Sequence, residues 1–385
     1  MGGLYNVWDY REAAKRRMPR AFFEFLDRGT EDGHAMRANR NALEAVKLRQ
    51  RILQDVRHID TSTELFGRKL PLPLATAPTG VADIIAYRGE LAVARAAGKA
   101  GIPYTLATSS TTLMEAVVEA ATAGCWLQMY VWEDREASYS VAARAQCAGM
   151  EALVITVDSP VLANREYNSR NGFIYPIKAR PRLVADVLSH PVWSAQTLGR
   201  YWMTGGLPRY ANYPDDMSGK VTRKVSRRAN SASVTWDDIA RFRDFWKGKL
   251  ILKGILEPAD AVRASKLGAD AISVSNHGGR MFDAAPSGLE MLSEIVRAVP
   301  SSMTIFYDGG VRRGLDIMRA LALGAHAVLI GRATLYGVAV KGEEGASHVI
   351  DILTEELRRG MGLAGLTSVS QICSDCLWPP REVAR

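Results

Sequence analysis

The chain has 385 residues, of which 47% are hydrophobic and 23% charged, with a formal net charge of +8. This composition excludes a largely disordered chain and allows one large core, since a single α/β barrel with extensions commonly reaches this length. The four cysteines are too few for a disulfide framework, and neither a secretory leader nor a long apolar run occurs, so a cytoplasmic protein is expected.

Residues 1–69 precede any repeating pattern and are expected to form a helical N-terminal extension, with Asp9–Arg17 and Arg20–Arg28 as its helices. An alternative of equal weight is that the extension is a plain cap. Such a cap would close the bottom of a barrel, the end that serves stability rather than catalysis.

From residue 70 onwards, short apolar runs rich in β-branched residues alternate with longer amphipathic stretches, as in βα units around a parallel sheet. The eight apolar runs are Leu72–Pro78, Pro103–Thr108, Trp126–Val131, Ala152–Asp158, Leu250–Gly254, Ala271–Asn276, Met303–Gly309 and Ala327–Gly331. Helical patterns between them, each ending near a glycine that can cap it, include Gly89–Ala100, Arg135–Ala148, Pro258–Leu267, Leu289–Val299 and Gly314–Leu323. Eight units predict an α/β fold of the (β/α)₈ TIM barrel type, as a single domain over residues 1–385. An open doubly wound sheet is disfavoured, because Ala77–Gly80 lacks the glycine-rich turn that binds dinucleotides.

Residues 173–233 interrupt the pattern after the fourth strand and form a long insertion rich in basic and aromatic residues. Trp193, Tyr201 and Trp202 with flanking arginines suit a membrane interface, where amphipathic rings and cations lie at the level of the headgroups. A mobile lid or a subunit contact is an alternative of equal weight. The basic residues are Lys178, Arg180, Arg182, Arg200, Arg209, Lys220, Arg223, Lys224, Arg227 and Arg228.

The catalytic groups of a (β/α)₈ barrel lie at the carboxyl ends of the strands and in the loops that follow. This rule selects polar and charged residues at the ends of the third to eighth runs. They are Gln128 and Tyr130, Thr156 and Asp158 with Arg165 beyond, Lys253, the stretch Ser275–Arg280, the stretch Asp308–Arg312, and Gly331 with Arg332.

The last two of these loops are where barrels commonly bind a phosphate through backbone N–H groups at a helix start. Gly309, Gly310 and Gly331 permit close approach of the backbone, and Arg312 and Arg332 can add paired hydrogen bonds. The alternative is two ordinary glycine turns with solvated arginines.

The other strand ends carry groups for acid–base chemistry and for binding an anion. His277 can take a proton, and Arg280 and Arg165 can hold a carboxylate through paired N–H bonds, which would fix the orientation of the substrate. Asp158 can orient His277 and stabilise its charged form. Lys253 ends an apolar strand and needs an anionic partner, because a buried unpaired charge is costly. A reduced flavin would provide one, whereas a Schiff-base aldolase is the rival use of such a lysine.

These motifs resemble the family of FMN-dependent 2-hydroxy-acid oxidases and dehydrogenases, and the resemblance runs nearly from end to end. It is carried by Ser275–Arg280, Leu252–Gly254, Gln128–Tyr130, Thr156–Asp158, Asp308–Arg312 and Ala320–Ala325. The resemblance implies FMN as cofactor and oxidation of an (S)-2-hydroxy acid to the 2-oxo acid.

The resemblance also implies a role for each residue. His277 would be the general base, with Asp158 as its partner. The other residues of the reaction would be Arg165 and Arg280 for the substrate carboxylate, Tyr130 for its hydroxyl and Lys253 for the reduced flavin. The cofactor-binding residues would be Ala77, Pro78, Thr79, Gln128, Thr156 and Ser275 around the flavin ring, Gly310, Arg312, Gly331 and Arg332 at its phosphate, and Asp308.

Two positions depart from the usual pattern of the family. Phe25 stands where the N-terminal segment usually offers a tyrosine to the substrate carboxylate, and Ser109 stands where glycolate oxidase carries a tryptophan. The first change removes a hydrogen bond to a charged group, worth roughly 1.5–3 kcal/mol, and the second leaves room beside the flavin. Both changes favour an aromatic or larger hydroxy acid such as (S)-mandelate or hydroxymandelate.

The segments Leu48–Leu53 and Gly331–Tyr336 look more like the bacterial membrane-linked dehydrogenases than the soluble oxidases of the family. A quinone rather than oxygen is therefore expected as electron acceptor, with the insertion docking the enzyme on the cytoplasmic face of the membrane. The resemblance further implies a homotetramer. No nucleic acid is expected as partner and no metal, since Cys373 and Cys376 have the spacing of only half a zinc site.

Four other functions stay open from the sequence. An L-lactate dehydrogenase or oxidase of the same family would share every group named above. An FMN barrel isomerase or an aldolase-type lyase would leave the two arginines near His277 unused. A binding protein without turnover predicts substitutions among His277, Arg280 and Lys253, and all three are present.

Overall fold

Eight parallel strands form the centre of the protein in a computed structural model that describes residues 3–173, 177–214, 219–221 and 232–379. The strands are β4 (Leu74–Thr76), β5 (Tyr104–Ala107), β6 (Cys125–Met129), β7 (Ala152–Thr156), β8 (Lys249–Ile255), β9 (Ala271–Val274), β10 (Thr304–Asp308) and β11 (Ala327–Ile330). Each overlaps one of the eight apolar runs, so the prediction of the strands is confirmed. Their order in the sheet is β4-β11-β10-β9-β8-β7-β6-β5.

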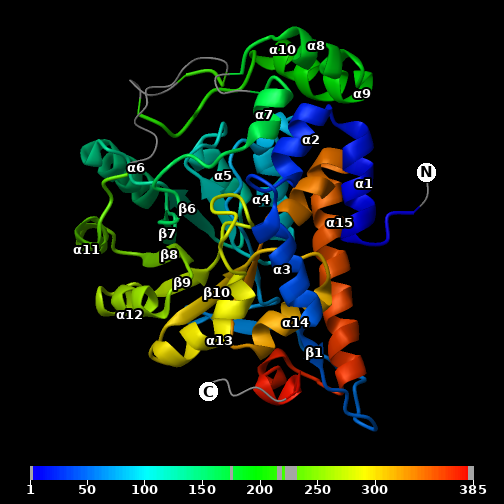
Figure 1. The fold of residues 1–385 in the computed structure, drawn as a ribbon, viewed down its shortest axis with the longest axis vertical. Helices are drawn as coiled ribbons and strands as arrows, with labels where there is room; N and C mark the ends of the chain where they lie inside the picture. Colours follow the sequence, from blue (N-terminus) through cyan, green and yellow to red (C-terminus); the bar gives the residue numbers. More distant parts are fainter. Residues whose placement is uncertain (1–2, 174–176, 215–218, 222–231, 380–385) are drawn as a thin grey trace.

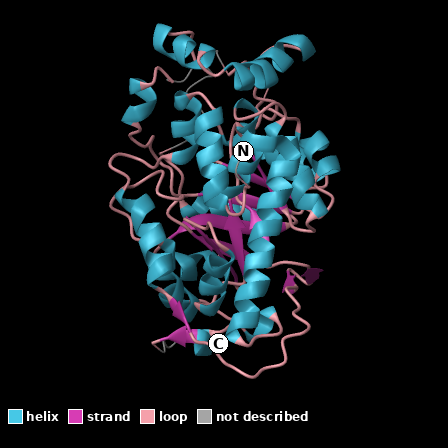
Figure 2. Ribbon diagram, turned by 90° about the vertical axis from the view of Figure 1, so that its right-hand side faces the viewer, coloured by secondary structure: helices cyan, strands magenta, loops and turns pink. Residues whose placement is uncertain are grey.

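The two edge strands, β4 and β5, meet and nearly close the sheet. The N–H of Thr76 donates to the carbonyl of Pro103 at 3.0 Å, and the N–H of Thr105 donates to the Thr76 hydroxyl at 2.9 Å. Figure 2 shows the strands at the centre with helices around them. The predicted (β/α)₈ barrel is confirmed, and the carboxyl ends of its strands therefore share one rim.

The helices that follow the strands form the outer ring. They are α4 (Gly89–Lys99), α5 (Met114–Ala120), α6 (Arg135–Cys147), α11 (Trp236–Phe245), α12 (Pro258–Lys266), α13 (Gly288–Ala298), α14 (Gly314–Ala322) and α15 (Arg332–Ala364). Five of them coincide with predicted helical patterns, whereas α5, α11 and the full length of α15 were not predicted. The helix α15 bends at Lys341 and Gly342 and packs along α1, α4 and α14.

The barrel interior and the space between sheet and helices are two separate apolar layers. Along β10, Phe306 belongs to the interior layer, while Ile305 and Tyr307 belong to the layer under the helices. This alternation follows from the period of two along a strand. Inside the barrel, the rings of Phe306 and Trp126 meet edge to face with centroids 5.6 Å apart.

A hairpin of the N-terminal extension closes the lower end of the barrel. It consists of β2 (Thr63–Leu65) and β3 (Arg68–Leu70), whose residues Leu65 and Leu70 are buried in the interior layer. Phe66 at its turn lies 6.2 Å from Trp126 and 6.1 Å from Phe306, measured between ring centroids. The alternative of a bottom cap therefore holds for this hairpin only.

The rest of the extension runs along one side of the barrel to the opposite end. The helices α1 (Val7–Arg17) and α2 (Arg20–Asp27) confirm the predicted ones, and α3 (His34–Ala45) follows. The strand β1 (Lys47–Leu48) pairs antiparallel with β12 (Leu377–Trp378) at the far end of the chain. In Figure 1, α2 lies beside α7 (Glu166–Arg170), above the strand ends.

The described part of the insertion forms short helices over the upper end of the molecule, above α2 (Figure 1). They are α8 (Pro181–Leu188), α9 (Pro191–Trp193), the π-helical turn η2 (Ser194–Gly199) and α10 (Arg200–Thr204). The predicted basic residues Arg223, Lys224, Arg227 and Arg228 lie outside the described residues. Across the described ranges, no helix is both long and apolar enough to cross a membrane.

Candidate active site

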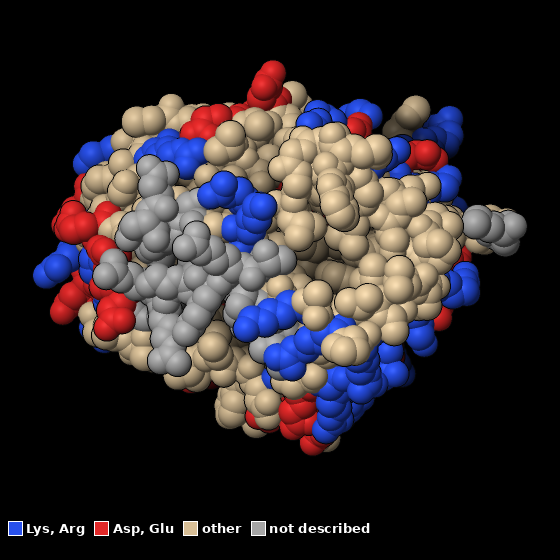
Figure 3. Space-filling model, turned by 90° about the horizontal axis from the view of Figure 1, so that it is seen from above, with Lys and Arg blue, Asp and Glu red and all other residues tan. Residues whose placement is uncertain are grey.

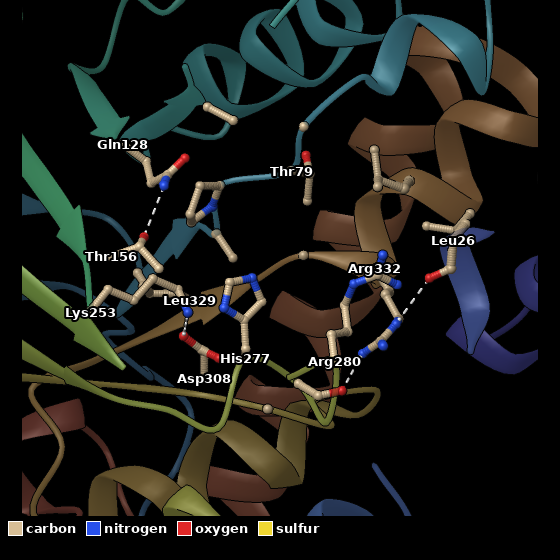
Figure 4. A pocket seen from close by; sticks show the side chains of 18 of the residues that line it. Leu26, Thr79, Gln128, Thr156, Lys253, His277, Arg280, Asp308, Leu329 and Arg332 are labelled. Atoms are coloured by element: carbon tan, nitrogen blue, oxygen red, sulfur yellow. Dashed lines mark hydrogen bonds and ion pairs between the residues drawn. The ribbon is translucent and has the colours of Figure 1, made fainter. Parts of the chain in front are cut away.

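A deep cavity opens at the carboxyl ends of the strands, where the sequence places the candidate residues. It encloses about 1220 Å³ including its open mouth, somewhat more than one drug-sized ligand needs. Figure 4 shows side chains from several strands and loops converging on it. The candidate residues in its lining are Phe25, Ala77, Pro78, Thr79, Ser109, Gln128, Tyr130, Thr156, Arg165, Lys253, His277, Arg280, Asp308, Gly310, Arg312, Gly331 and Arg332. The other two, Asp158 and Ser275, lie behind the lining and contact His277 and Lys253.

His277 and Asp158 form a hydrogen-bonded pair at the wall of this cavity. The Nδ1 atom of His277 lies 2.9 Å from Oδ1 of Asp158. Burial pushes the pKa of Asp158 upward, but the charge and hydrogen bond of His277, with the charge of Lys253, hold that pKa below its ordinary value. The carboxylate therefore stays ionised and can only accept, so Nδ1 of His277 is the donor of this bond and Nε2 is the nitrogen left to exchange a proton with a ligand.

The carboxylate of Asp158 is confined by the backbone of β8. Gly254 has a φ of +106°, and a Cβ added to it would lie 2.6 Å from the Cγ atom of Asp158. Ser159 Oγ donates to Oδ1 of Asp158 at 3.0 Å. The other oxygen, Oδ2, is buried and has no hydrogen-bond partner in the part of the chain that the structure describes. Asp158 is thus held in one place and can still accept a hydrogen bond.

The backbone at His277 is strained. After β9 the chain turns through three consecutive residues with positive φ, His277 at +58°, Gly278 at +62° and Gly279 at +72°. A residue other than glycine in this region costs on the order of 1–3 kcal/mol and is typical of functional sites. The N–H of His277 donates to Ser275 Oγ at 3.0 Å, which fixes the turn and the direction of the imidazole.

Lys253 has an anionic partner within the protein. Its Nζ atom lies 2.8 Å from Oδ2 of Asp308 and donates to Ser275 Oγ at 2.8 Å. Burial lowers the pKa of Lys253, but the charges of Asp308 and Asp158 outweigh burial and raise the pKa overall. Asp308 therefore supplies a counter-charge within the protein, and the expected interaction of Lys253 with a reduced flavin stays a prediction. Lys253 nevertheless lines the cavity and keeps its positive charge there.

Three half-buried arginines crowd one side of the cavity, and most of their hydrogen bonds go to backbone carbonyls. Arg165 donates to the carbonyl of Arg280 at 2.9 Å, Arg280 to that of Phe25 at 2.8 Å, and Arg332 to that of Gly278 at 2.9 Å. Burial, followed by the charge of a neighbouring arginine, lowers the pKa of Arg280 and of Arg332 to about 10. Figure 4 shows these two side chains next to each other. A bound anion would relieve both effects, so this side of the cavity is suited to a carboxylate.

The part of the cavity around Arg332 and the start of α15 is suited to a phosphate. The helix α15 begins at the cavity, with Gly331 before its first turn and no side chain capping it. A Cβ added to Gly331 would lie 3.4 Å from the Cβ of Ala77, so the helix start passes close to the loop after β4. Arg312 lines the same region, and its Nε is buried without a hydrogen-bond partner among the described residues. Free helix N–H groups and the unpartnered Nε–H of Arg312 fit the phosphate of an FMN molecule.

The flavin ring would be held by the strands between these two ends. Gln128 on β6 donates from Nε2 to the hydroxyl of Thr156 on β7 at 2.9 Å, and both side chains line the cavity. This bond uses one of the two amide protons of Gln128, so its second proton and its oxygen can meet a ligand. The lining of backbone and amide groups here fits the polar edge of a flavin.

The two positions that depart from the family pattern both line the cavity. The ring of Phe25 lies 5.4 Å from the guanidinium carbon of Arg280 and 5.0 Å from the ring of Phe173. Ser109 packs against the loop after β4, since a Cβ added to Gly80 would lie 2.3 Å from Ser109 Oγ. The room expected beside Ser109 is therefore bounded closely by Gly80.

Several lining residues were not predicted from the sequence. Leu329 could have been found, because it is an inward position of the eighth strand. Ala107 is likewise a strand residue, the last of β5. The others come from α2, from the loop after β4 and from α15, and no local pattern shows that these segments cover the rim. The residues missed are Leu26, Gly80, Val81, Ile85, Ala107, Leu329 and Leu335.

Sequence relatives cover nearly the whole chain. The FMN-dependent dehydrogenase family matches residues 14–379. An L-lactate dehydrogenase of Alcaligenes faecalis is 40% identical over 374 residues, which are 96% of this chain and 97% of the relative. An L-lactate dehydrogenase of Pseudomonas syringae pv. syringae is 39% identical over 379 residues, covering 97% and 98%.

Solved structures agree with the fold. The monotopic membrane protein (S)-mandelate dehydrogenase superposes with a TM-score of 0.91 at 35% identity, covering 97% of this chain and 99% of its own. A mandelate oxidase superposes with a TM-score of 0.80 at 36% identity, covering 96% and 97%. The relatives by sequence and the neighbours by structure thus carry the names of two different substrates.

Proposed function

The chain belongs to the FMN-dependent dehydrogenase family and its cofactor is FMN, and from this premise we propose that it oxidises an (S)-2-hydroxy acid to the 2-oxo acid. The observation that carries the proposal is the position of His277. It is backed by the ionised Asp158 and shares one cavity with the half-buried Arg165 and Arg280. A base next to an anion site is what a substrate with a carboxylate and an adjacent C–H and O–H requires.

In this proposal the chain binds and orients the substrate before it takes a proton. Arg165 and Arg280 hold the carboxylate through paired N–H bonds. This fixes which hydrogen of the substrate faces the electron acceptor. His277 takes a proton on Nε2, and Asp158 stabilises the resulting positive charge. Burial, followed by the charge of Asp158, raises the pKa of Tyr130, so its phenol keeps the proton and can donate to the substrate oxygen.

When bound, FMN supplies the site that receives the two electrons of the substrate. Lys253 would stabilise the negative charge that accompanies reduction, and Ser275 would act through Lys253 and Asp308, which it contacts. The residues proposed to hold the ring are Ala77, Pro78, Thr79, Gln128 and Thr156, and those proposed to hold the phosphate are Gly310, Arg312, Gly331 and Arg332.

An aromatic hydroxy acid such as (S)-mandelate or hydroxymandelate is the proposed substrate. Phe25, Val81 and Ile85 give the cavity apolar walls, and Phe25 offers no hydroxyl to the carboxylate. The second candidate is L-lactate. It is favoured by relatives named L-lactate dehydrogenase that are 40% identical over 96% of the chain.

A membrane quinone, with oxygen as the alternative, is the proposed electron acceptor. Trp202, Met203 and Leu188 on the helices of the insertion are 87%, 78% and 73% exposed, which is unusual for large apolar side chains. Figure 3 looks down on this end and shows tan side chains with Lys and Arg side chains beside them. Such a surface supports docking on the cytoplasmic face of an anionic membrane. The homotetramer stays a prediction, which analytical ultracentrifugation would test.

An anaerobic absorption titration of the holoenzyme with (S)-mandelate, and separately with L-lactate, tests the activity and the substrate together. We expect (S)-mandelate to bleach the visible band of the oxidised flavin rapidly. Equal or faster bleaching by L-lactate would keep the reaction and replace the aromatic substrate by the second candidate. A flavin that no 2-hydroxy acid reduces would contradict the proposed activity.

A further inference from the structure

A second cavity lies inside the insertion and is lined almost entirely by apolar side chains. It encloses about 880 Å³ including its mouth, between α8, η2, α10 and residues 207–208. Leu183 and Trp193 are buried in its wall, whereas Val184 and Leu188 are 41% and 73% exposed. An open apolar cavity of this kind is typical of a site for an apolar ligand.

This apolar cavity shares a wall with the active-site cavity. On α2, Phe22 lines the apolar cavity, while Phe25 lines the active-site cavity. Ile84, the last residue of the 3₁₀ turn η1 (Ala82–Ile84), lines the apolar cavity, and the next residue, Ile85, lines the active-site cavity. One helix and one turn therefore separate the proposed flavin site from the apolar cavity.

Aromatic rings in contact cross that wall from one cavity to the other. Ring centroids are 5.0 Å apart for Phe25 and Phe173, 5.2 Å for Phe173 and Phe22, and 4.7 Å for Phe22 and Trp193. The indole N–H of Trp193 donates to the carbonyl of Ile85 at 2.8 Å, which fastens the wall. Phe22, Phe173 and Trp193 are buried, and electron transfer between the two cavities would cross only a few side chains.

The polar side chains in the lining of the apolar cavity are few and include groups that can exchange protons. They are Asp83, Lys178, Thr197 and Tyr201. Burial raises the pKa of Asp83, and burial followed by the charge of Asp83 raises the pKa of Glu90, whose N–H donates to Asp83 at 3.0 Å. A buried carboxyl pair of this kind retains a proton at neutral pH more readily than two exposed carboxylates.

We propose that the apolar cavity binds the ring of a lipid-soluble quinone, which enters from the membrane side of the insertion and receives electrons through the wall of α2 and η1. The inference rests on the proposed 2-hydroxy-acid oxidation, which supplies the electrons. The substrate loses two electrons and two protons, and the quinone takes up two electrons and two protons to become the quinol. The sum is 2-hydroxy acid plus quinone to 2-oxo acid plus quinol, so that both sides balance.

The experiment compares variants that fill the cavity with one that does not, using holoenzyme in detergent and a short-chain quinone. Val184→Trp and Val187→Trp place an indole in the lining, and Met203→Trp adds the same side chain on the exposed surface outside it. We expect the first two to raise the KM for quinone by about tenfold or more and Met203→Trp to leave it unchanged. The rate of flavin reduction by the hydroxy acid should be the same in all three variants. In the wild type, a photoreactive azidoquinone should label peptides within residues 177–208.

The outcomes separate this inference from the proposed function. Normal flavin reduction together with an unchanged KM for quinone in both valine variants would overturn the quinone site alone. Labelling confined to residues of the active-site cavity would also overturn it. If a fatty acid prevents labelling and unlabelled quinone does not, the cavity is a lipid site and the quinone site is likewise overturned. Failure of every hydroxy acid to reduce the wild-type flavin would instead contradict the proposed function.

Discussion

Asp158 has a largely enclosed carboxyl group, with a side chain 14% exposed, that nevertheless stays charged. Its pKa lies below the ordinary aspartate value, because the effects of His277 and Lys253 exceed that of burial. A carboxylate with a lowered pKa in the folded state contributes stability that is present above its unfolded pKa of about 3.9 and is lost as the pH falls through the folded value. The pair Asp158 and His277 should therefore remain intact in mildly acidic solution.

Replacing Asp158 by asparagine tests this electrostatic role. The variant lacks the charge that stabilises protonated His277, so we expect flavin reduction by the hydroxy acid to slow by about 10²–10⁴-fold. The contribution of the charge to the free energy of unfolding should be constant near neutral pH and shrink below about pH 4. Denaturant unfolding of both holoenzymes across this range measures it. A difference that grows in acid would show that the sign of the pKa shift is wrong.

At this scale the sequence identified most of the side chains in the cavity, since strand ends of a barrel converge on one rim. It did not identify which of them pair. Lys253 pairs with Asp308 from another strand, and Asp27 accepts from Tyr336 at 2.6 Å across nearly the whole length of the chain. Pairs of this kind depend on tertiary structure and leave no local pattern.

The strands were predictable because each is buried on both faces and reads as a short continuous apolar run. The hairpin of β2 and β3 was not, because only Leu65 and Leu70 of its strands are buried and its exposed half reads as a loop. The helix α3 was also missed. Its first turn follows Gly33, which has no side chain to cap it, and the N–H of Ala35 donates instead to the distant Asp283 at 3.1 Å. The usual local N-terminal signal is therefore absent.

The strand β8 carries a local irregularity that serves the site. Its pairing with β9 shifts between Lys253 and Ile255, and Gly254 between them has a φ of +106°. The irregularity gives Asp158 the space in which it faces His277, because any Cβ at position 254 would overlap the carboxylate. A small backbone feature of one element thus positions a side chain of another.

Comparing Gly254→Ala with Gly149→Ala should separate the cost of backbone strain, which both substitutions share, from the clash with Asp158, which only Gly254→Ala creates. Gly149 also has a positive φ, +85°, but a Cβ there would meet no atom within 4 Å. We expect Gly149→Ala to cost on the order of 1 kcal/mol of stability without slowing flavin reduction. Gly254→Ala should cost more and slow flavin reduction by about tenfold or more, because Asp158 is displaced. Equal effects of the two substitutions on stability and on rate would count against the assigned role of Gly254.

The net positive charge and the exposed apolar side chains of the molecule both agree with the proposed membrane contact. The chain has a net charge of +8, and the described helices of the insertion expose Trp202, Met203 and Leu188 at the end where the active-site cavity opens. The sequence predicted a membrane-facing insertion with a lid or subunit contact as the alternative. The composition alone could not decide between them, because all three use aromatic and basic residues.

Trp202→Ala tests the membrane contact, with Trp378→Ala as its control. Trp202 is 87% exposed on α10, whereas Trp378 is 57% exposed on β12 near the opposite end of the molecule. We expect Trp202→Ala to weaken sedimentation with anionic vesicles by about tenfold, since burying a large apolar side chain contributes about 1.5–3 kcal/mol. Trp378→Ala should bind like the wild type, and both should bind less at high salt. Equal loss in the two variants would argue against a contact through α10.

The central claim is that His277 takes the proton of a 2-hydroxy acid while bound FMN takes its electrons. Anaerobic stopped-flow absorption of wild-type and His277→Gln holoenzyme, mixed with (S)-mandelate or L-lactate, tests it most directly. We predict that the variant retains its flavin but is reduced at least about 10³-fold more slowly than the wild type, near the upper end of what a general base contributes. Reduction of the variant at the wild-type rate would contradict the account, because the proton would then be taken by another group.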